Sequence, residues 1–226
     1  MISLTLELVL NAERVKRILE IAYGVGALLQ GEFTLASGKK SKYYFDGKKL
    51  TLSPEGSYQV GKVIFDELAE IGVDAIGGVT TGGYPIATAV ALISHLEGKP
   101  IPSFIVRELP KEHGTQRQIE GHLKPGSRVA IVDDVITTGG SVRKAVEAVE
   151  AVNCKVVKVI VIVDRHEGGS DQLKEAGYDF TAILHLWPSE EITIGEPSAE
   201  RFTFQISRFL TLLARDWIKA LRGGTS

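Results

Sequence analysis

The sequence predicts an α/β protein with a central, mostly parallel β-sheet flanked by helices. From Asp74 onward, short apolar segments alternate with segments of helical periodicity, which is the pattern of repeated β-α units. The aliphatic run at 129–132 is followed by a hydroxyl- and glycine-rich turn that leads into a helix-forming stretch. Hydrophobic residues make up 44% of the 226 residues, which is enough for a proper core.

The amino-terminal part predicts two helices and a hairpin that stand beside this sheet. Residues 12–30 carry helical periodicity, with Val15, Ile18 and Ala22 on one stripe. The segment 32–46, EFTLASGKKSKYYFD, alternates and is broken by Ser-Gly, so it indicates a hairpin. A second helix is expected from Pro54, after Ser53, to about residue 71. We call residues 1–72 the hood.

The core is expected to span residues 73–190 and to alternate strands with helices. Its predicted strands are 74–79, 101–106, 128–133, 155–164 and 180–186, and its predicted helices are 85–96, 142–152 and 170–176. The polar segment 107–127 shows neither pattern and predicts a mobile lid. A final amphipathic helix at 198–221 would form a C-terminal extension, 191–226, that packs on the body or on a partner, and we expect all 226 residues to form one domain.

Composition excludes several classes of function. The chain has 26 basic and 28 acidic side chains, so its net charge of -2 predicts binding neither to nucleic acid nor to an acidic membrane. Its single cysteine, Cys154, excludes an internal disulfide and suits a reducing compartment. The first ten residues, MISLTLELVL, lack the basic start of a signal peptide and are interrupted by Glu7. We therefore expect a cytoplasmic protein without a membrane span.

The segment VAIVDDVITTGGS, 129–141, carries the most specific chemical signal. The predicted strand ends with Asp133 and Asp134 at the carboxyl edge of the sheet, where ligands bind in open parallel sheets. The amides of 136–141 would favour an anion such as phosphate, and adjacent carboxylates suit sugar hydroxyls or a hydrated divalent cation. A purely structural helix cap is the alternative. Neither a Walker A loop nor a dinucleotide fingerprint matches, and no His/Cys cluster suggests zinc.

This segment resembles the phosphoribosyl pyrophosphate signature of the type I phosphoribosyltransferases. The resemblance implies that fold, Mg²⁺ as cofactor and phosphoribosyl pyrophosphate as a substrate. Asp133 and Asp134 would act in catalysis by holding the ribose hydroxyls, directly or through Mg²⁺ that is bound mainly by substrate oxygens and water. Residues 137–141 would cradle the 5′-phosphate, and the residues that follow the acidic pair would all bind this substrate: Val135, Ile136, Thr137, Thr138, Gly139, Gly140 and Ser141.

Flanking segments resemble one branch of that family, the orotate phosphoribosyltransferases. FTLASGKKSKYYFD at 33–46 matches F-T-L-x-S-G-x-x-S-x-Y-Y-x-D, and GGVTTGGYP at 77–85 matches the pyrophosphate loop in position. Arg165, in VDRHEGG, would hold the orotate with Thr137 nearby. Taken singly, these pieces also fit an edge hairpin, a plain turn and a surface ion pair.

The segment RELPKEHGTQRQIEG, 107–121, resembles the basic loop of that branch. By resemblance, Arg107, Lys111 and His113 would bind phosphoribosyl pyrophosphate in the partner's active site of a homodimer, with Lys111 and His113 catalytic. A solvated charged loop is the alternative. Many family members have lysines where this chain has Ala36, Gly82 and Glu108, and we expect Glu108, beside an anionic leaving group, to slow turnover.

Three functions remain open at this point. The leading one is transfer of a phosphoribosyl group to orotate, giving orotidine 5′-monophosphate and pyrophosphate in pyrimidine synthesis. A phosphoribosyltransferase for a purine base is the second, and Arg165 without a purine-stacking signature disfavours it. The third is a non-catalytic regulator that senses phosphoribosyl pyrophosphate, which the acidic balance and the absence of a basic patch disfavour.

Overall fold

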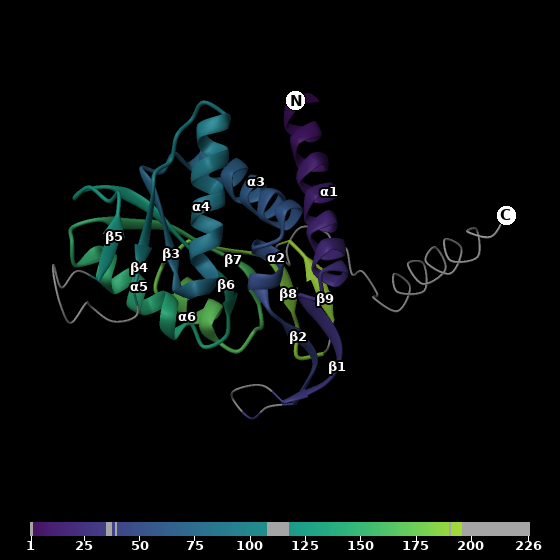
Figure 1. Ribbon diagram of the computed structural model, residues 1–226. Coiled ribbons are helices and arrows are strands. Elements are labelled where there is room, and N and C mark those ends of the chain that lie inside the picture. Colours follow the sequence, from purple (N-terminus) through teal and green to yellow (C-terminus); the bar gives the residue numbers. More distant parts are fainter. Residues whose placement is uncertain (1, 35–37, 39, 108–117, 190, 196–226) are drawn as a thin grey trace.

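The computed structural model describes residues 2–34, 38, 40–107, 118–189 and 191–195. The helices and strands follow in the order α1 (Ile2–Gly24), β1 (Leu28–Thr34), β2 (Lys40–Phe45), α2 (Gly47–Thr51), α3 (Pro54–Ile71), β3 (Ala75–Val79), α4 (Thr80–Leu96), β4 (Ser103–Val106), β5 (Ile119–Gly121), β6 (Arg128–Ile136), α5 (Gly140–Glu150), β7 (Lys155–Asp164), α6 (Gly169–Glu175), β8 (Phe180–Leu186) and β9 (Ile192–Ile194) (Figure 1).

A seven-stranded sheet forms the centre of the molecule, with the strand order β5-β4-β3-β6-β7-β8-β9. Every neighbouring pair from β4 to β8 is parallel, and only the short outer strands β5 and β9 are antiparallel. The predicted mostly parallel α/β sheet is therefore confirmed. β9, which lies in the segment expected to form the C-terminal extension, pairs with β8.

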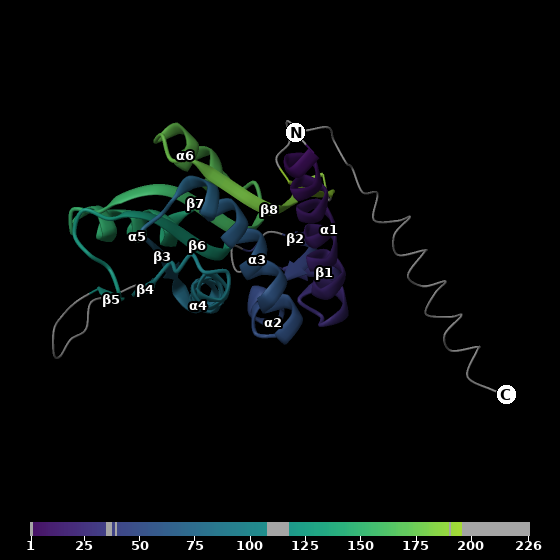
Figure 2. The ribbon, with the colours of Figure 1, turned by 90° about the horizontal axis from the view of Figure 1, so that it is seen from above.

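Helices cover both faces of this sheet because β6 is apolar on both sides. Ala130 and Val132 pack into one core with residues of α1, α3 and α4, whereas Val129 and Ile131 pack into a second core with residues of α5 and α6. Seen from above, α4 lies on one side of the strands and α6 on the other (Figure 2). Burial on both faces explains why these strands are almost continuously aliphatic.

The hood contains its own small sheet, in which β1 and β2 pair antiparallel. This hairpin extends away from the helices, below α1 in Figure 1. α3 begins and ends where the sequence predicts. The Ser53 side chain accepts a hydrogen bond from Gly56 N, Pro54 occupies the first turn, and Gly72 ends the helix with a φ of 69°.

Several predicted boundaries were wrong. The first helix ends at Gly24 and not at Gln30, because Gly26 turns the chain with a φ of 66° and residues 28–30 pair with β2. α4 begins at Thr80, before the predicted start at Pro85. The segment 107–127 contains β5, so it is not wholly irregular. The short helix α2 and strand β9 were not predicted, and the helix expected at 198–221 lies outside the described residues.

Two further observations bear on expectations from composition. Among the helices that the structure describes, none is long and apolar enough to span a bilayer. Cys154 is buried and is a free thiol, and it packs in the core beneath α5. Its role there is that of a small apolar residue.

Candidate active site

The acidic pair lies within β6 and not beyond its end. The predicted strand stopped at Val132 or Asp133, but β6 continues to Ile136 because residues 133–136 pair with 161–164 of β7. The long partner strand therefore extends β6 past the aliphatic run. Asp133 and Asp134 consequently have strand geometry, and both carboxylates lie near the start of α4, that of Asp133 at Thr80 and that of Asp134 at Gly82.

Asp133 is fixed by the start of α4. The residue is 4% exposed, and its Oδ1 accepts hydrogen bonds from Thr80 Oγ1 at 3.1 Å and from Asp134 N at 3.0 Å. Thr80 Oγ1 in turn accepts a hydrogen bond from Gly82 N at 3.2 Å. Thr80 has a φ of 56°, which is uncommon for a β-branched residue. This strained turn therefore ties the predicted pyrophosphate loop to the acidic pair.

Asp134 lies between α2 and α4, against two glycines. A methyl group at either Gly47 or Gly82 would overlap its carboxylate. Burial raises the pKa of Asp134, and the nearby Lys48 ammonium acts in the opposite direction. The glycines of GGVTTGGYP thus serve close packing at the start of a helix, where the sequence had indicated a loop. Gly82 in particular leaves room for this conformation of Asp134.

The segment 137–141 forms the turn from β6 into α5. Thr137, Thr138 and Ser141 are exposed, and Gly139 takes a φ of 75° as the residue before the helix. Gly169 N donates a hydrogen bond to Thr137 O at 2.9 Å, so the turn rests on the start of α6. Exposed hydroxyls and amides at the amino end of a helix suit a phosphate.

Two residues of the predicted phosphate-binding set face the core with their side chains. Ile136 is 1% exposed, and Val135 packs against the core that contains α1, α3 and α4. Only their backbone atoms can therefore face a ligand. Ile136 O already accepts a hydrogen bond from Arg165 N at 3.1 Å, which holds the ends of β6 and β7 together.

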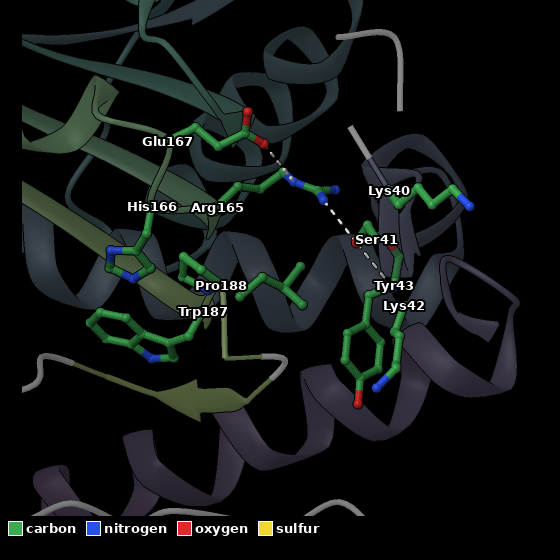
Figure 3. Close-up of a pocket in the computed structure, with 10 residues that line it drawn as sticks. Lys40, Ser41, Lys42, Tyr43, Arg165, His166, Glu167, Trp187 and Pro188 are labelled. Atoms are coloured by element: carbon green, nitrogen blue, oxygen red, sulfur yellow. Dashed lines mark hydrogen bonds and ion pairs between the residues drawn. The ribbon is translucent and has the colours of Figure 1, made fainter. Parts of the chain in front are cut away.

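Arg165 lies in a pocket between the core and the hood. The pocket has a volume of about 220 Å³ and is lined by Lys40, Ser41, Lys42, Tyr43, Arg165, His166, Glu167, Leu186, Trp187 and Pro188 (Figure 3). The guanidinium contacts Glu167, with Nε 3.3 Å from Oε1, and Nη2 donates to Ser41 Oγ at 3.2 Å. Sequence reasoning found Arg165 but assigned no role to Ser41 or Glu167, although Ser41 is part of the matched hood motif.

The basic loop is described only at its base. Arg107 N donates to Gln118 O at 2.9 Å, and Arg107 Nη1 lies 3.1 Å from Glu120 Oε1. These bonds bring the two ends of the loop together beside β4 and β5. Lys111, His113 and Glu108 lie outside the described residues. The structure thus places one of the three predicted loop cations.

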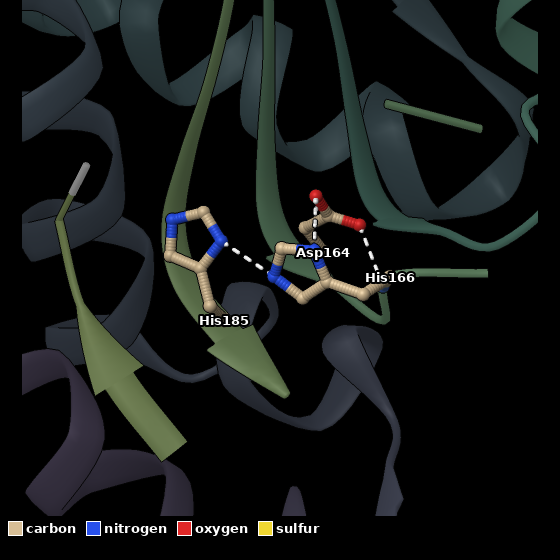
Figure 4. A group of neighbouring side chains, drawn as sticks. All are labelled: Asp164, His166 and His185. Carbon is tan, nitrogen blue, oxygen red and sulfur yellow. Dashed lines mark hydrogen bonds and ion pairs between the residues drawn. The ribbon is translucent and has the colours of Figure 1, made fainter. Parts of the chain in front are cut away.

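A cluster that the sequence did not indicate stands behind the pocket. Asp164 Oδ2 lies 3.6 Å from His166 Nδ1, and His166 Nε2 lies 3.0 Å from His185 Nδ1 (Figure 4). Burial lowers the pKa of both histidines, that of His185 to about 4. Register could have suggested the cluster, since Asp164 and His185 are paired residues of β7 and β8.

These three side chains offer ligand atoms for a metal that all lie within 4.8 Å of one another. As placed, however, Asp164 and His185 contact opposite nitrogens of the His166 ring, so the three form a chain and do not converge on one point. The His166 ring also stacks on Trp187, with centroids 3.6 Å apart. The cluster therefore supports the wall of the pocket beside Arg165.

Comparison with known proteins gives consistent results. Residues 58–189 match the family model of the phosphoribosyl transferase domain. The chain is 46% identical to the orotate phosphoribosyltransferase of Aquifex aeolicus over 154 residues, which cover 68% of this chain and 84% of that protein. Residues 58–189 contain β3 to β8 with the acidic pair, the turn 137–141 and Arg165, whereas the hairpin and α2 precede them.

Solved structures of similar proteins share the fold. The orotate phosphoribosyltransferase of Mycobacterium tuberculosis in complex with Fe(III) dicitrate is 35% identical, with a TM-score of 0.67, and the match covers 76% of this chain and 97% of that one. The complex of the Mycobacterium tuberculosis enzyme with 5-phospho-alpha-D-ribosyl 1-diphosphate gives 32% identity and a TM-score of 0.62 over 78% of this chain and 96% of that one.

Proposed function

This chain belongs to the phosphoribosyltransferase family, among its orotate phosphoribosyltransferases, and we propose that the edge formed by β6 and β7 is its active site. The reaction transfers the 5-phosphoribosyl group from phosphoribosyl pyrophosphate to orotate, giving orotidine 5′-monophosphate and pyrophosphate for pyrimidine synthesis. One observation carries the placement. The phosphate-type turn and the pocket of Arg165 are joined directly, through Gly169 N to Thr137 O and Arg165 N to Ile136 O.

The sugar donor is proposed to bind along 133–141. The turn 137–141 offers backbone amides and the exposed hydroxyls of Thr137, Thr138 and Ser141 to the 5′-phosphate. Asp133 and Asp134 then face the ribose hydroxyls and favour the positive charge that develops on the ring as pyrophosphate leaves. The hydrogen bonds of Asp133 with Thr80 Oγ1 and Asp134 N fix the carboxylate before substrate arrives.

Orotate is proposed to bind in the pocket of Arg165. A guanidinium can grip a carboxylate with two parallel hydrogen bonds, and orotate carries one carboxylate on a planar ring. The Arg165 side chain is only 11% exposed, so water weakens the interaction little. Thr137 is the first residue of the turn after β6, where its carbonyl accepts a hydrogen bond from Gly169 N, and it is assigned to both ligands.

Mg²⁺ is proposed as the cofactor, and the donor set fits it. Asp133 and Asp134 offer carboxylate oxygens, the ligand type that Mg²⁺ prefers together with substrate oxygens and water. When bound, the ion supplies charge neutralisation to the pyrophosphate. The two carboxylates would hold it beside the ribose, while most of its ligands come from the substrates and from water.

The remaining proposals concern the loop and the assembly. Arg107, Lys111 and His113 are proposed to bind the pyrophosphate in the site of a partner subunit, so that a homodimer shares its active sites. Glu108 would oppose them by its charge. Treatment of residues 1–226 as one domain with a hood, a core and a C-terminal extension stays a prediction, as does a cytoplasmic location.

Replacement of Arg165 tests the placement of the base. We expect Arg165→Ala to raise the KM for orotate roughly a hundredfold, because a charged, nearly buried hydrogen-bonding partner is worth about 3 kcal/mol. The KM for phosphoribosyl pyrophosphate should change less than about twofold on the same energy scale. Steady-state kinetics with each substrate varied in turn measures both, and equal changes in the two constants would remove this role.

Subunit mixing tests the shared site. Lys111→Ala and Asp133→Asn variants are each expected to be nearly inactive, whereas a mixture should regain activity in hybrid dimers that contain one intact site. Subunit exchange is followed separately by native mass spectrometry of differently tagged chains. Demonstrated exchange without recovery of activity would show that the loop serves its own subunit.

A further inference from the structure

Ser41 joins the hood hairpin to Arg165 across the base pocket. Its hydroxyl accepts hydrogen bonds from Arg165 Nη2 at 3.2 Å and from Tyr43 N at 3.1 Å, and it donates to Tyr43 O at 2.8 Å. One hydroxyl thus uses its single donor and both acceptor lone pairs. Its oxygen is therefore fixed relative to β2, and it offers Arg165 a rigid acceptor.

Glu167 holds the guanidinium from the other side. Its Oε1 lies 3.3 Å from Arg165 Nε, and the two side chains are only 11% and 13% exposed. Between them in sequence, His166 has a φ of 51°, a left-handed turn that lets Arg165 and Glu167 reach the same pocket. Figure 3 shows Arg165 bridging between Glu167 and Ser41.

Two of the five donors of the guanidinium are engaged in these contacts, which leaves donors for a ligand. Contacts at Nε and at one terminal nitrogen restrict the Arg165 side chain to few rotamers. The entropy of ordering it is therefore spent before the ligand binds, and this favours affinity for a planar carboxylate. A ligand without a carboxylate cannot form the two parallel, charge-assisted hydrogen bonds that this arrangement favours.

We propose that Ser41 and Glu167 are positioning residues that hold Arg165 for the carboxylate of the pyrimidine base. The proposal rests on the proposed function, in which Arg165 binds that carboxylate. Because Ser41 belongs to β2, affinity for the base carboxylate depends on the hood hairpin as well as on the core. Glu167 and Ser41 act through Arg165 and not on the reacting atoms.

The test compares Ser41→Ala and Glu167→Ala with Arg165→Ala by steady-state kinetics. Each positioning variant should raise the KM for orotate about tenfold, equivalent to about 1.4 kcal/mol, with the KM for phosphoribosyl pyrophosphate changed less than about twofold. The conservative variants Ser41→Thr and Glu167→Gln keep an acceptor and should recover most of the affinity. Ser57→Ala, at a half-buried position of α3, and Glu175→Ala, at an exposed position of α6, are the matched controls and should behave as wild type.

Uracil, a base without a carboxylate, separates loss of the Arg165 contact from general damage to the pocket. General damage would weaken the binding of uracil as well as that of orotate. Inhibition by uracil should change less than about twofold in Ser41→Ala and Glu167→Ala, because uracil lacks the carboxylate that Arg165 is proposed to bind. Equal loss of uracil and orotate binding would overturn the proposal. So would wild-type orotate kinetics in both alanine variants when Arg165→Ala is impaired. If Arg165→Ala itself binds orotate normally, the proposed function of Arg165 is at fault.

Discussion

Substitution of Gly169 by alanine should damage the phosphate turn without touching a ligand. A Cβ at this position would lie 2.5 Å from Thr137 O, 2.6 Å from Gly139 N and 2.8 Å from Thr138 C. All three atoms are backbone atoms of the turn between β6 and α5, so no side chain can rotate out of the way. The turn must move by about 1 Å for ordinary contacts to be restored.

Two measurable losses follow from this displacement. Overpacking of this kind costs about 1–3 kcal/mol of stability, which urea unfolding measures. Misplacement of catalytic groups by about 1 Å can cost about a hundredfold in rate, so we expect the kcat/KM for phosphoribosyl pyrophosphate to fall between tenfold and a hundredfold. Binding of the sugar donor, measured by calorimetry, should weaken in parallel, because the amides that are proposed to bind the 5′-phosphate lie in the displaced turn.

Gly24→Ala is the control for this experiment. Gly24 is in α1, and a Cβ there meets nothing within 4 Å, so alanine should leave the kinetics unchanged and not lower stability. Gly169→Ala with donor affinity within about twofold of wild type would refute the reasoning. In that case either the turn is not held by α6 or it does not bind the phosphate.

Two further predictions concern stability. The Lys158 side chain is 7% exposed, and its Nζ lies 2.7 Å from Glu67 Oε1 and 2.9 Å from Asp179 Oδ1. Lys158→Ala should therefore lower the free energy of unfolding by about 2 kcal/mol. This is less than the loss expected for a fully buried ion pair, because both acids reach water. An unchanged urea midpoint would exclude a stabilising network there. Burial lowers the pKa of His185 from 6.5 to about 4, so the unfolded chain binds more protons than the folded chain between these pH values. The free energy of unfolding should therefore decline as pH falls from 6.5 to 4, by at most about 3 kcal/mol. Urea titrations across this range should show a smaller decline in His185→Gln, and an equal decline would assign it to other groups.

The central sheet could be predicted because its signal is local. Each buried strand is a run of aliphatic residues, and the intervening helices have clear periodicity, so the parallel core followed from the order of segments along the chain. Helix α3 was also predicted at both ends, since Ser53, Pro54 and Gly72 act through bonds to their immediate neighbours. Such features need no knowledge of the tertiary structure.

The errors arose where distant partners decide the structure. β6 continues through Asp133 and Asp134 because β7 offers a paired strand, and no local signal predicts a strand at two acidic residues. Gly82 and Gly83 indicate a turn in the sequence, but they lie in the first turn of α4. They are glycines there because β6 lies too close for a Cβ. The short strands β5 and β9 exist only through pairing with β4 and β8.

The site shows the same division. The residues of 133–141 and Arg165 that are proposed to bind ligands stand in recognisable motifs, so they could be named from the sequence. The residues that support them stand in no such motif, and the sequence did not predict their roles. Thr80 meets Asp133 from another strand end, Ser41 reaches Arg165 from the hood, and His166 stacks on Trp187 across the sheet edge. These contacts follow from strand order and register, which a single sequence does not specify.

Turnover with a panel of bases tests the central claim most directly. The purified protein is incubated with phosphoribosyl pyrophosphate, Mg²⁺ and orotate, uracil, adenine, hypoxanthine or guanine, and release of pyrophosphate and consumption of each base are followed. We predict that orotate alone is consumed rapidly, with one pyrophosphate released per orotidine 5′-monophosphate formed. Turnover of a purine base without turnover of orotate would contradict the assignment of Arg165 as the ligand of the base carboxylate.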